Sequence, residues 1–121
     1  MRYLPAVLAL LLPLSAHAEG SAEKGAIVFK KCSACHDAEQ PRNKIGPTLV
    51  GIVGRKAGSI ADFKYSDAMT KAGADGVVWD TKTIGDYLAA PRKFIPGNKM
   101  SFTGLKDPQD VEDLIAYLGR L

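Results

Sequence analysis

The feature that most constrains this chain is the pentapeptide Cys32-Ser33-Ala34-Cys35-His36, which contains both cysteines of the sequence. Two thiols separated by two residues lie about one helical turn apart, so each can add to one vinyl group of a porphyrin. The imidazole of the next residue, His36, then lies beneath the metal at the centre of the ring. The motif therefore predicts one haem c, attached covalently through Cys32 and Cys35 with His36 as an iron ligand.

Three other kinds of site compete with this interpretation. A thioredoxin-like redox motif follows a β-strand within a βαβ unit, whereas the residues before Cys32 have a helical pattern. A structural zinc site needs four ligands, and beyond residue 18 the chain offers only Cys32, Cys35 and His36 as cysteine or histidine ligands. A plain disulfide, or two buried thiols, would leave His36 without a role. Haem attachment is the interpretation that uses all three side chains.

The first 18 residues have the pattern of a secretory signal peptide. Arg2 gives a positive start, the segment 4–14 is apolar but interrupted by prolines, and Ala16-His17-Ala18 has the form of a peptidase cleavage site. An uncleaved membrane anchor is the alternative, although the apolar segment is short for a span. We therefore expect a signal peptide at residues 1–18, one domain at residues 19–121, and a bacterial periplasm as the location.

Short helices and long irregular segments make up the rest of the chain. Serine and aspartate residues that suit helix N-caps precede the expected helices, and Gly73 and Pro91 suit the ends of the second and third. No periodic pattern spans the glycine-rich segment 37–60 or the segment 92–106, so both are expected to be loops. The expected helices cover residues 22–31 after Ser21, 67–72 after Ser66, 81–90 after Asp80 or Thr81, and 108–118 after Asp107.

An iron ligated by His36 needs a second axial ligand or an open position. Met69 and Met100 are the only methionines beyond the signal peptide. Met69 lies in a short helix and can be a flexible core filler, whereas Met100 lies in a Pro-Gly loop that can aim its side chain into a pocket. We predict Met100 as the second ligand. A neutral thioether donates weakly to ferric iron, so this ligation raises the reduction potential and leaves no position for oxygen or peroxide.

These landmarks together resemble class I cytochrome c, the soluble bacterial and mitochondrial type. The resemblance covers essentially all of residues 19–121. It implies an all-α cytochrome c fold, in which short helices and long loops surround one covalently bound haem and the N- and C-terminal helices cross near Gly25 and Tyr117. The matching segments are Gly25, Phe29, 32–36, 46–49, 54–56, 63–66, Trp79, Tyr87, Pro91, 94–100, Phe102 and 114–118.

The resemblance also implies roles for residues around the haem. The carbonyl of Pro47 would accept the free ring N–H of His36, and Tyr87 would pack near the sulfur of Met100. Three further side chains, those of Arg55, Tyr65 and Trp79, would hold a haem propionate. The alternatives are that Trp79 and Tyr87 are ordinary core aromatic residues and that Arg55 is a solvated loop charge. Met69 and Asn98 depart from the family pattern, which usually has asparagine and threonine at these positions.

The distribution of charge indicates the kind of partner. The formal net charge of +3 is too small for a nucleic-acid-binding protein. Several basic residues flank the haem motif and the Met100 loop, resembling the basic ring that steers acidic redox partners toward an exposed haem edge; the alternative is an ordinary surface of mixed charge. The residues of this basic set are Lys30, Lys31, Lys44, Arg92, Lys93 and Lys99.

The function expected from the resemblance is electron transfer without catalysis. The chain would be a monomer without stable membrane insertion that moves single electrons in a respiratory or similar pathway. Expected partners are a quinol–cytochrome c oxidoreductase, a terminal oxidase, a photosynthetic reaction centre or a periplasmic dehydrogenase. Two alternatives remain: a haem subunit dedicated to one oxidoreductase, or a peroxidase-like enzyme or gas sensor in which Met100 leaves the iron.

Overall fold

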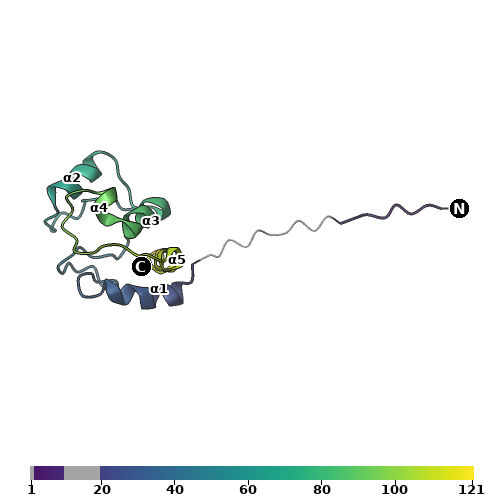
Figure 1. Cartoon of the computed structure of the whole chain (residues 1–121), viewed down its shortest axis with the longest axis horizontal. Helices are drawn as coiled ribbons and strands as arrows, with labels where there is room; N and C mark the ends of the chain where they lie inside the picture. Colours follow the sequence, from purple (N-terminus) through teal and green to yellow (C-terminus); the bar gives the residue numbers. More distant parts are fainter. Residues whose placement is uncertain (1, 10–19) are drawn as a thin grey trace.

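Five α-helices and one short 3-10 helix, joined by long loops, make up the computed structural model, which describes residues 2–9 and 20–121 (Figure 1). The predicted cleavage site at Ala16-His17-Ala18 lies outside the described residues. Within those residues the only β-structure is an isolated bridge between Lys56 and Val78, which confirms the expected all-α class. The helices are α1 (Ala22–Val28), η1 (Phe29–Lys31), α2 (Asp67–Ala74), α3 (Thr81–Ala89), α4 (Pro91–Phe94) and α5 (Pro108–Leu118).

The predicted N-caps are confirmed at four helices. The side chains of Ser21, Ser66 and Asp107 each accept a backbone N–H from the first turn of the following helix. Asp80 accepts the N–H of Thr83, whose hydroxyl in turn accepts the N–H of Asp80, which forms a capping box. These bonds satisfy donors that a helix leaves unpaired at its start, which explains why the helices begin at these residues.

The ends of the helices were predicted less well. Gly73 was expected to end α2, but the helix continues to Ala74 and the left-handed glycine is Gly76, with φ of 101°. Gly73 lies inside the helix, at a position where a side chain would overlap the carbonyl oxygen of Ala57, so this glycine permits close packing instead of ending the helix. Pro91 does follow the end of α3, but it also begins α4, so the expectation of a loop from residue 92 onward was partly wrong.

The first and last helices cross at Gly25, as the sequence indicated. A Cβ atom at this position would overlap the carbonyl oxygen of Asp113 on α5 and would lie 2.8 Å from Cβ of Tyr117. The rings of Phe29 and Tyr117 pack beside the crossing with their centroids 5.4 Å apart, and Figure 1 shows α5 nearly end-on next to α1. Leu114 of α5, only 1% exposed, lies in the core. The predicted crossing of the terminal helices is therefore confirmed.

The buried carboxylate of Asp113 fastens the start of α1 to α5. Its Oδ1 accepts the backbone N–H of Ser21 at 2.8 Å and the side-chain amide of Gln109 at 3.0 Å. These hydrogen bonds, the one from Ser21 foremost, hold the pKa of Asp113 below its ordinary value. The carboxylate therefore stabilises the fold while it is ionised.

This carboxylate predicts a specific acid sensitivity. Because the pKa of Asp113 is lower in the folded than in the unfolded chain, its contribution is complete above about pH 4 and is lost as the pH falls through the folded value. We expect Asp113→Asn to be less stable at pH 7 and to lose less stability than the native protein on acidification below about pH 4. Urea unfolding at a series of pH values measures both effects, and parallel pH profiles for the two proteins would contradict the prediction.

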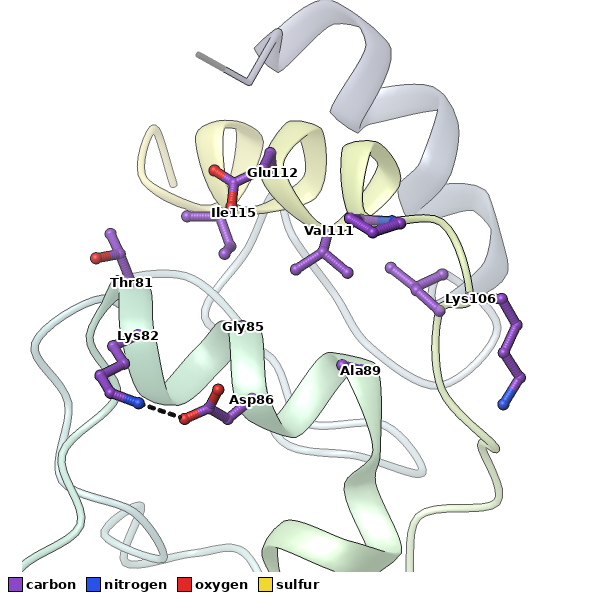
Figure 2. A pocket seen from close by; sticks show the side chains of 11 residues that line it. Thr81, Lys82, Gly85, Asp86, Ala89, Lys106, Val111, Glu112 and Ile115 are labelled. Atoms are coloured by element: carbon purple, nitrogen blue, oxygen red, sulfur yellow. Dashed lines mark hydrogen bonds and ion pairs between the residues drawn. The ribbon is translucent and has the colours of Figure 1, made fainter. Parts of the chain in front are cut away.

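A groove of about 360 Å³ runs between α3 and α5 (Figure 2). Gly85 forms part of its wall on α3, facing Val111 and Ile115 of α5. A Cβ atom on Gly85 would lie 3.4 Å from Cδ1 of Ile115 and 3.8 Å from Cγ1 of Val111, which are ordinary contact distances. The helix thus has a glycine where the surrounding space permits a side chain.

We therefore expect Gly85→Ala to stabilise the protein by about 1 kcal/mol, because alanine loses less backbone entropy than glycine on forming a helix. Gly73→Ala is the matched control, since it makes the same change inside α2. There the new methyl group meets the carbonyl of Ala57, so this variant should be destabilised. Thermal unfolding of both variants checks the opposite signs, and a loss of stability in Gly85→Ala would refute the first expectation.

Candidate cofactor site

The Cys32–His36 motif forms a tight turn directly after η1. The backbone N–H groups of Cys35 and His36 both donate to the carbonyl of Cys32, at 3.1 and 3.0 Å. Cys32 and Cys35 form no disulfide with each other, and both are half-buried. Burial, together with the neighbouring Cys35, raises the pKa of the Cys32 thiol. The turn therefore presents two thiols and one imidazole from five consecutive residues.

The imidazole of His36 is held in one tautomer. Its Nδ1 lies 2.7 Å from the carbonyl oxygen of Pro47, and because a carbonyl can only accept, Nδ1 carries the proton. Burial is the main cause of the lowered pKa of His36, opposed in part by this hydrogen bond. The ring is therefore neutral and Nε2 keeps a free lone pair, which is the arrangement that metal-binding histidines use.

Gly46 allows the Pro47 loop to approach the imidazole. A side chain at Gly46 would overlap the ring atoms of His36, while the Gly46 N–H donates to the carbonyl of Cys35 at 2.8 Å. The loop thus closes directly over the motif. Its glycine was visible in the sequence beside Pro47, but the contact that requires it was not.

A set of polar side chains supports this loop, and sequence reasoning missed it. The buried Asp37 accepts backbone N–H groups at positions 39 and 40 and pairs with Arg42 at 2.9 Å. The hydroxyl of Thr48 donates to the carbonyl of Gln40 at 2.9 Å, and the Thr48 N–H donates to Oδ1 of Asn43 at 3.1 Å. These bonds fix the loop without regular secondary structure, so no periodic pattern in the sequence could reveal them.

The guanidinium of Arg55 lies against the same loop. Its two Nη atoms donate to the carbonyl oxygens of Thr48 at 2.7 Å and Val50 at 2.6 Å. A guanidinium has five N–H donors, so these two bonds leave donors for a further acceptor. Tyr65, the second residue predicted to contact a propionate, accepts the backbone N–H of Ile60 through its hydroxyl at 3.2 Å. Both side chains are anchored locally.

An aromatic cluster leads from the core to Met100. The ring of Tyr87 lies 5.0 Å from that of the buried Trp79, and both lie 6.3 Å from the ring of Phe94, measured between centroids. The hydroxyl of Tyr87 donates to Sδ of Met100 at 3.9 Å. Burial raises the pKa of Tyr87 to about 12, so the phenol stays a neutral donor at physiological pH.

The donor set fits a covalently attached haem. Two thiols, an imidazole with a free Nε2 and a thioether supported by a phenol are the attachment points and axial ligands that such a group uses. The sequence model of the Cytochrome c family matches residues 22–121.

The chain belongs to the cytochrome c family. It is 52% identical to cytochrome c2 of Agrobacterium tumefaciens (strain II Chrys), over 83% of this chain and 91% of that protein. It is also 52% identical to cytochrome c2 iso-2 of Magnetospirillum fulvum, over 77% of this chain and 94% of the relative. Cytochrome cH from Methylobacterium extorquens has a similar structure, with a TM-score of 0.77, 46% identity, and coverage of 84% of this chain and all of that one.

Membership of the family confirms the predicted cofactor and the predicted electron-transfer function. This cytochrome binds haem c covalently through Cys32 and Cys35, and it is a monohaem electron-transfer protein and not an enzyme. The thioredoxin-like, zinc and disulfide interpretations of the motif are therefore wrong. No helix within residues 2–9 or 20–121 of the cytochrome has the length and apolar character that crossing a membrane requires.

The basic set predicted to meet partners lies on four parts of the cytochrome, and all six residues are exposed. Lys30 and Lys31 are in η1, Arg92 and Lys93 are in α4, and Lys99 precedes Met100. Lys44 differs from the others because its Nζ donates to the carbonyl of Ser33 at 2.8 Å, which ties it to the haem motif. The remaining members are available on the surface as side-chain charges.

Proposed function

We propose that this cytochrome is a diffusible one-electron carrier in which His36 and Met100 are the axial ligands of the haem iron. The observation that carries the proposal is that one hydrogen bond orients each ligand. Pro47 fixes the imidazole of His36 so that Nε2 is free, and Tyr87 binds the sulfur of Met100. When bound, the haem supplies an iron that alternates between the ferric and ferrous states.

The surrounding residues tune and protect that group. A neutral thioether ligand disfavours the extra positive charge of the ferric state, and burial of the haem would act in the same direction, so both raise the reduction potential. The donation from Tyr87 to the sulfur withdraws electron density and acts in the same direction. We further propose that Arg55, Tyr65 and Trp79 hold a haem propionate, with Arg55 using the donors that Thr48 and Val50 leave free.

Location and partners follow from features outside the site. Residues 1–18 are proposed to be a cleaved signal peptide that delivers the domain at residues 19–121 to the periplasm. The basic set would steer acidic redox proteins toward the haem edge while keeping the complex short-lived. Suitable redox partners are a quinol–cytochrome c oxidoreductase, a terminal oxidase, a photosynthetic reaction centre or a periplasmic dehydrogenase.

The deciding experiment is the optical spectrum of the exported, purified protein in both redox states. A weak far-red band from sulfur-to-ferric-iron charge transfer, with sharp low-spin bands on reduction, is the expected result. A high-spin spectrum and ready binding of carbon monoxide would reject ligation by Met100. Mass spectrometry of the same sample tests the leader, because cleavage after Ala18 leaves Glu19 as the first residue.

A further inference from the structure

The side chain of Asn98 bonds across the base of the loop that carries Met100. Its Nδ2 donates to the carbonyl oxygens of Pro91 at 3.0 Å and Ile95 at 2.9 Å. Its Oδ1 accepts the backbone N–H of Met100 at 2.9 Å. One half-buried side chain therefore joins the backbone at both ends of α4 to the backbone of Met100.

The three partners fix the orientation of this amide. Carbonyl oxygens can only accept and a backbone N–H can only donate, so Nδ2 must face Pro91 and Ile95, and Oδ1 must face Met100. Both hydrogens of Nδ2 are used. An aspartate has no donor for the two carbonyls, and a threonine has a single hydroxyl donor. The position therefore uses both donors of the asparagine amide and also its acceptor oxygen.

The backbone around Met100 makes few other hydrogen bonds. Among the described residues, the backbone hydrogen bonds of Met100 run only to Asn98 and to the N–H of Phe102, at 3.0 Å. The N–H of Asn98 itself donates to Ile95 at 3.2 Å, and the next backbone bond to a helix is from Leu105. The side chain of Asn98 is thus the main link between the Met100 backbone and the rest of the fold.

We propose that Asn98 is a positioning residue that holds Met100 at the sixth coordination position and resists its displacement by other ligands. The inference rests on the proposed ligation of the iron by Met100. Tyr87 orients the sulfur end of the methionine, and Asn98 fixes its backbone end. Loosening the backbone end leaves the thioether intact but lowers the cost of moving it away from the iron.

The test is an imidazole titration of the ferric holoprotein. The loss of the far-red sulfur band reports how much imidazole has replaced Met100. We expect Asn98→Ala to bind imidazole about tenfold more tightly than the native protein, a difference equal to about 1.4 kcal/mol. Asn98→Asp keeps an acceptor for Met100 but loses both donors to α4, so it should change in the same direction. Ser101→Ala, an exposed change in the same loop, is the control and should leave the affinity unchanged.

The outcomes separate a positioning role from a merely structural one. Imidazole affinity within twofold of the native value in both Asn98 variants overturns the proposal, even if their melting temperatures fall. A native protein without the far-red band instead rejects ligation by Met100, which is a failure of the proposed function. Hydrogen exchange on the native protein needs no variant: the Met100 amide should exchange at least about tenfold more slowly than that of Lys99, and equal rates overturn the proposal.

Discussion

Replacing Met100 with alanine should leave the haem covalently attached through Cys32 and Cys35 but open the sixth coordination position. We expect the far-red sulfur band to disappear and carbon monoxide to bind the reduced protein readily. The reduction potential should fall on the order of 100 mV or more, because the ligand that favours ferrous iron is lost and water can enter the site. Optical titration in a redox cell measures the band and the potential, and the spectrum of the reduced protein after addition of carbon monoxide measures the third change.

Met69→Ala is the matched control for this experiment. Met69 is the other methionine beyond residue 18, and it packs against the hydrophobic core from α2. Removing it should lower stability, as in other core truncations, while the far-red band is retained. A Met100→Ala protein that keeps the band, or a Met69→Ala protein that loses it, would show that the ligand has been assigned to the wrong methionine.

A second large effect is expected at Gly25, where α1 touches α5. A methyl group there would overlap the carbonyl oxygen of Asp113, which belongs to a helix backbone and cannot rotate away. We expect Gly25→Ala to destabilise the protein by about 3 kcal/mol or more, at the upper end of the range for overpacked sites. Guanidinium unfolding of the holoprotein measures the change.

The sign of this effect is informative because helix propensity alone predicts the reverse. Within a solvent-facing helix, glycine to alanine stabilises by about 1 kcal/mol, which is the result expected above for Gly85→Ala. A Gly25→Ala protein as stable as the native one would mean that the two helices can separate without cost. It would therefore contradict the close crossing described here.

Features that depend on neighbouring residues in the sequence were predicted well. Ser66 and Asp80 were recognised as N-caps because a cap bonds within its own first turn, and the haem motif needs only five consecutive residues. The crossing at Gly25 was expected from the family resemblance, and glycine there allows another backbone to approach closely. Gly73 shows the limit of this reasoning, since a glycine near a helix end can serve either termination or close packing, and only its contact with Ala57 decides.

Contacts between irregular segments could not be predicted in the same way. The bonds of Thr48 to Gln40 and Asn43 connect residues whose spacing follows no period. Arg55 was expected at a propionate on the basis of family resemblance, but its bonds to Thr48 and Val50 depend on the path of the loop. Asn98 was recognised only as a departure from the family pattern. Its role depends on where the carbonyls of Pro91 and Ile95 lie in space.

The packing of α1 against α5 also affects when each part of the chain can fold during synthesis. Because α1 packs at Gly25 against α5, the last helix of the chain, α1 has no partner until almost the whole chain has been synthesised. The exposed pair of Glu23 with Arg120, at 3.2 Å, joins the same two ends of the domain. Closing a loop of that length is slow and entropically costly. The cysteine motif directly after α1 therefore remains on an unpacked segment until α5 has been synthesised. The same arrangement implies that a chain truncated before α5 would retain its thiols but would lack the surface on which α1 folds.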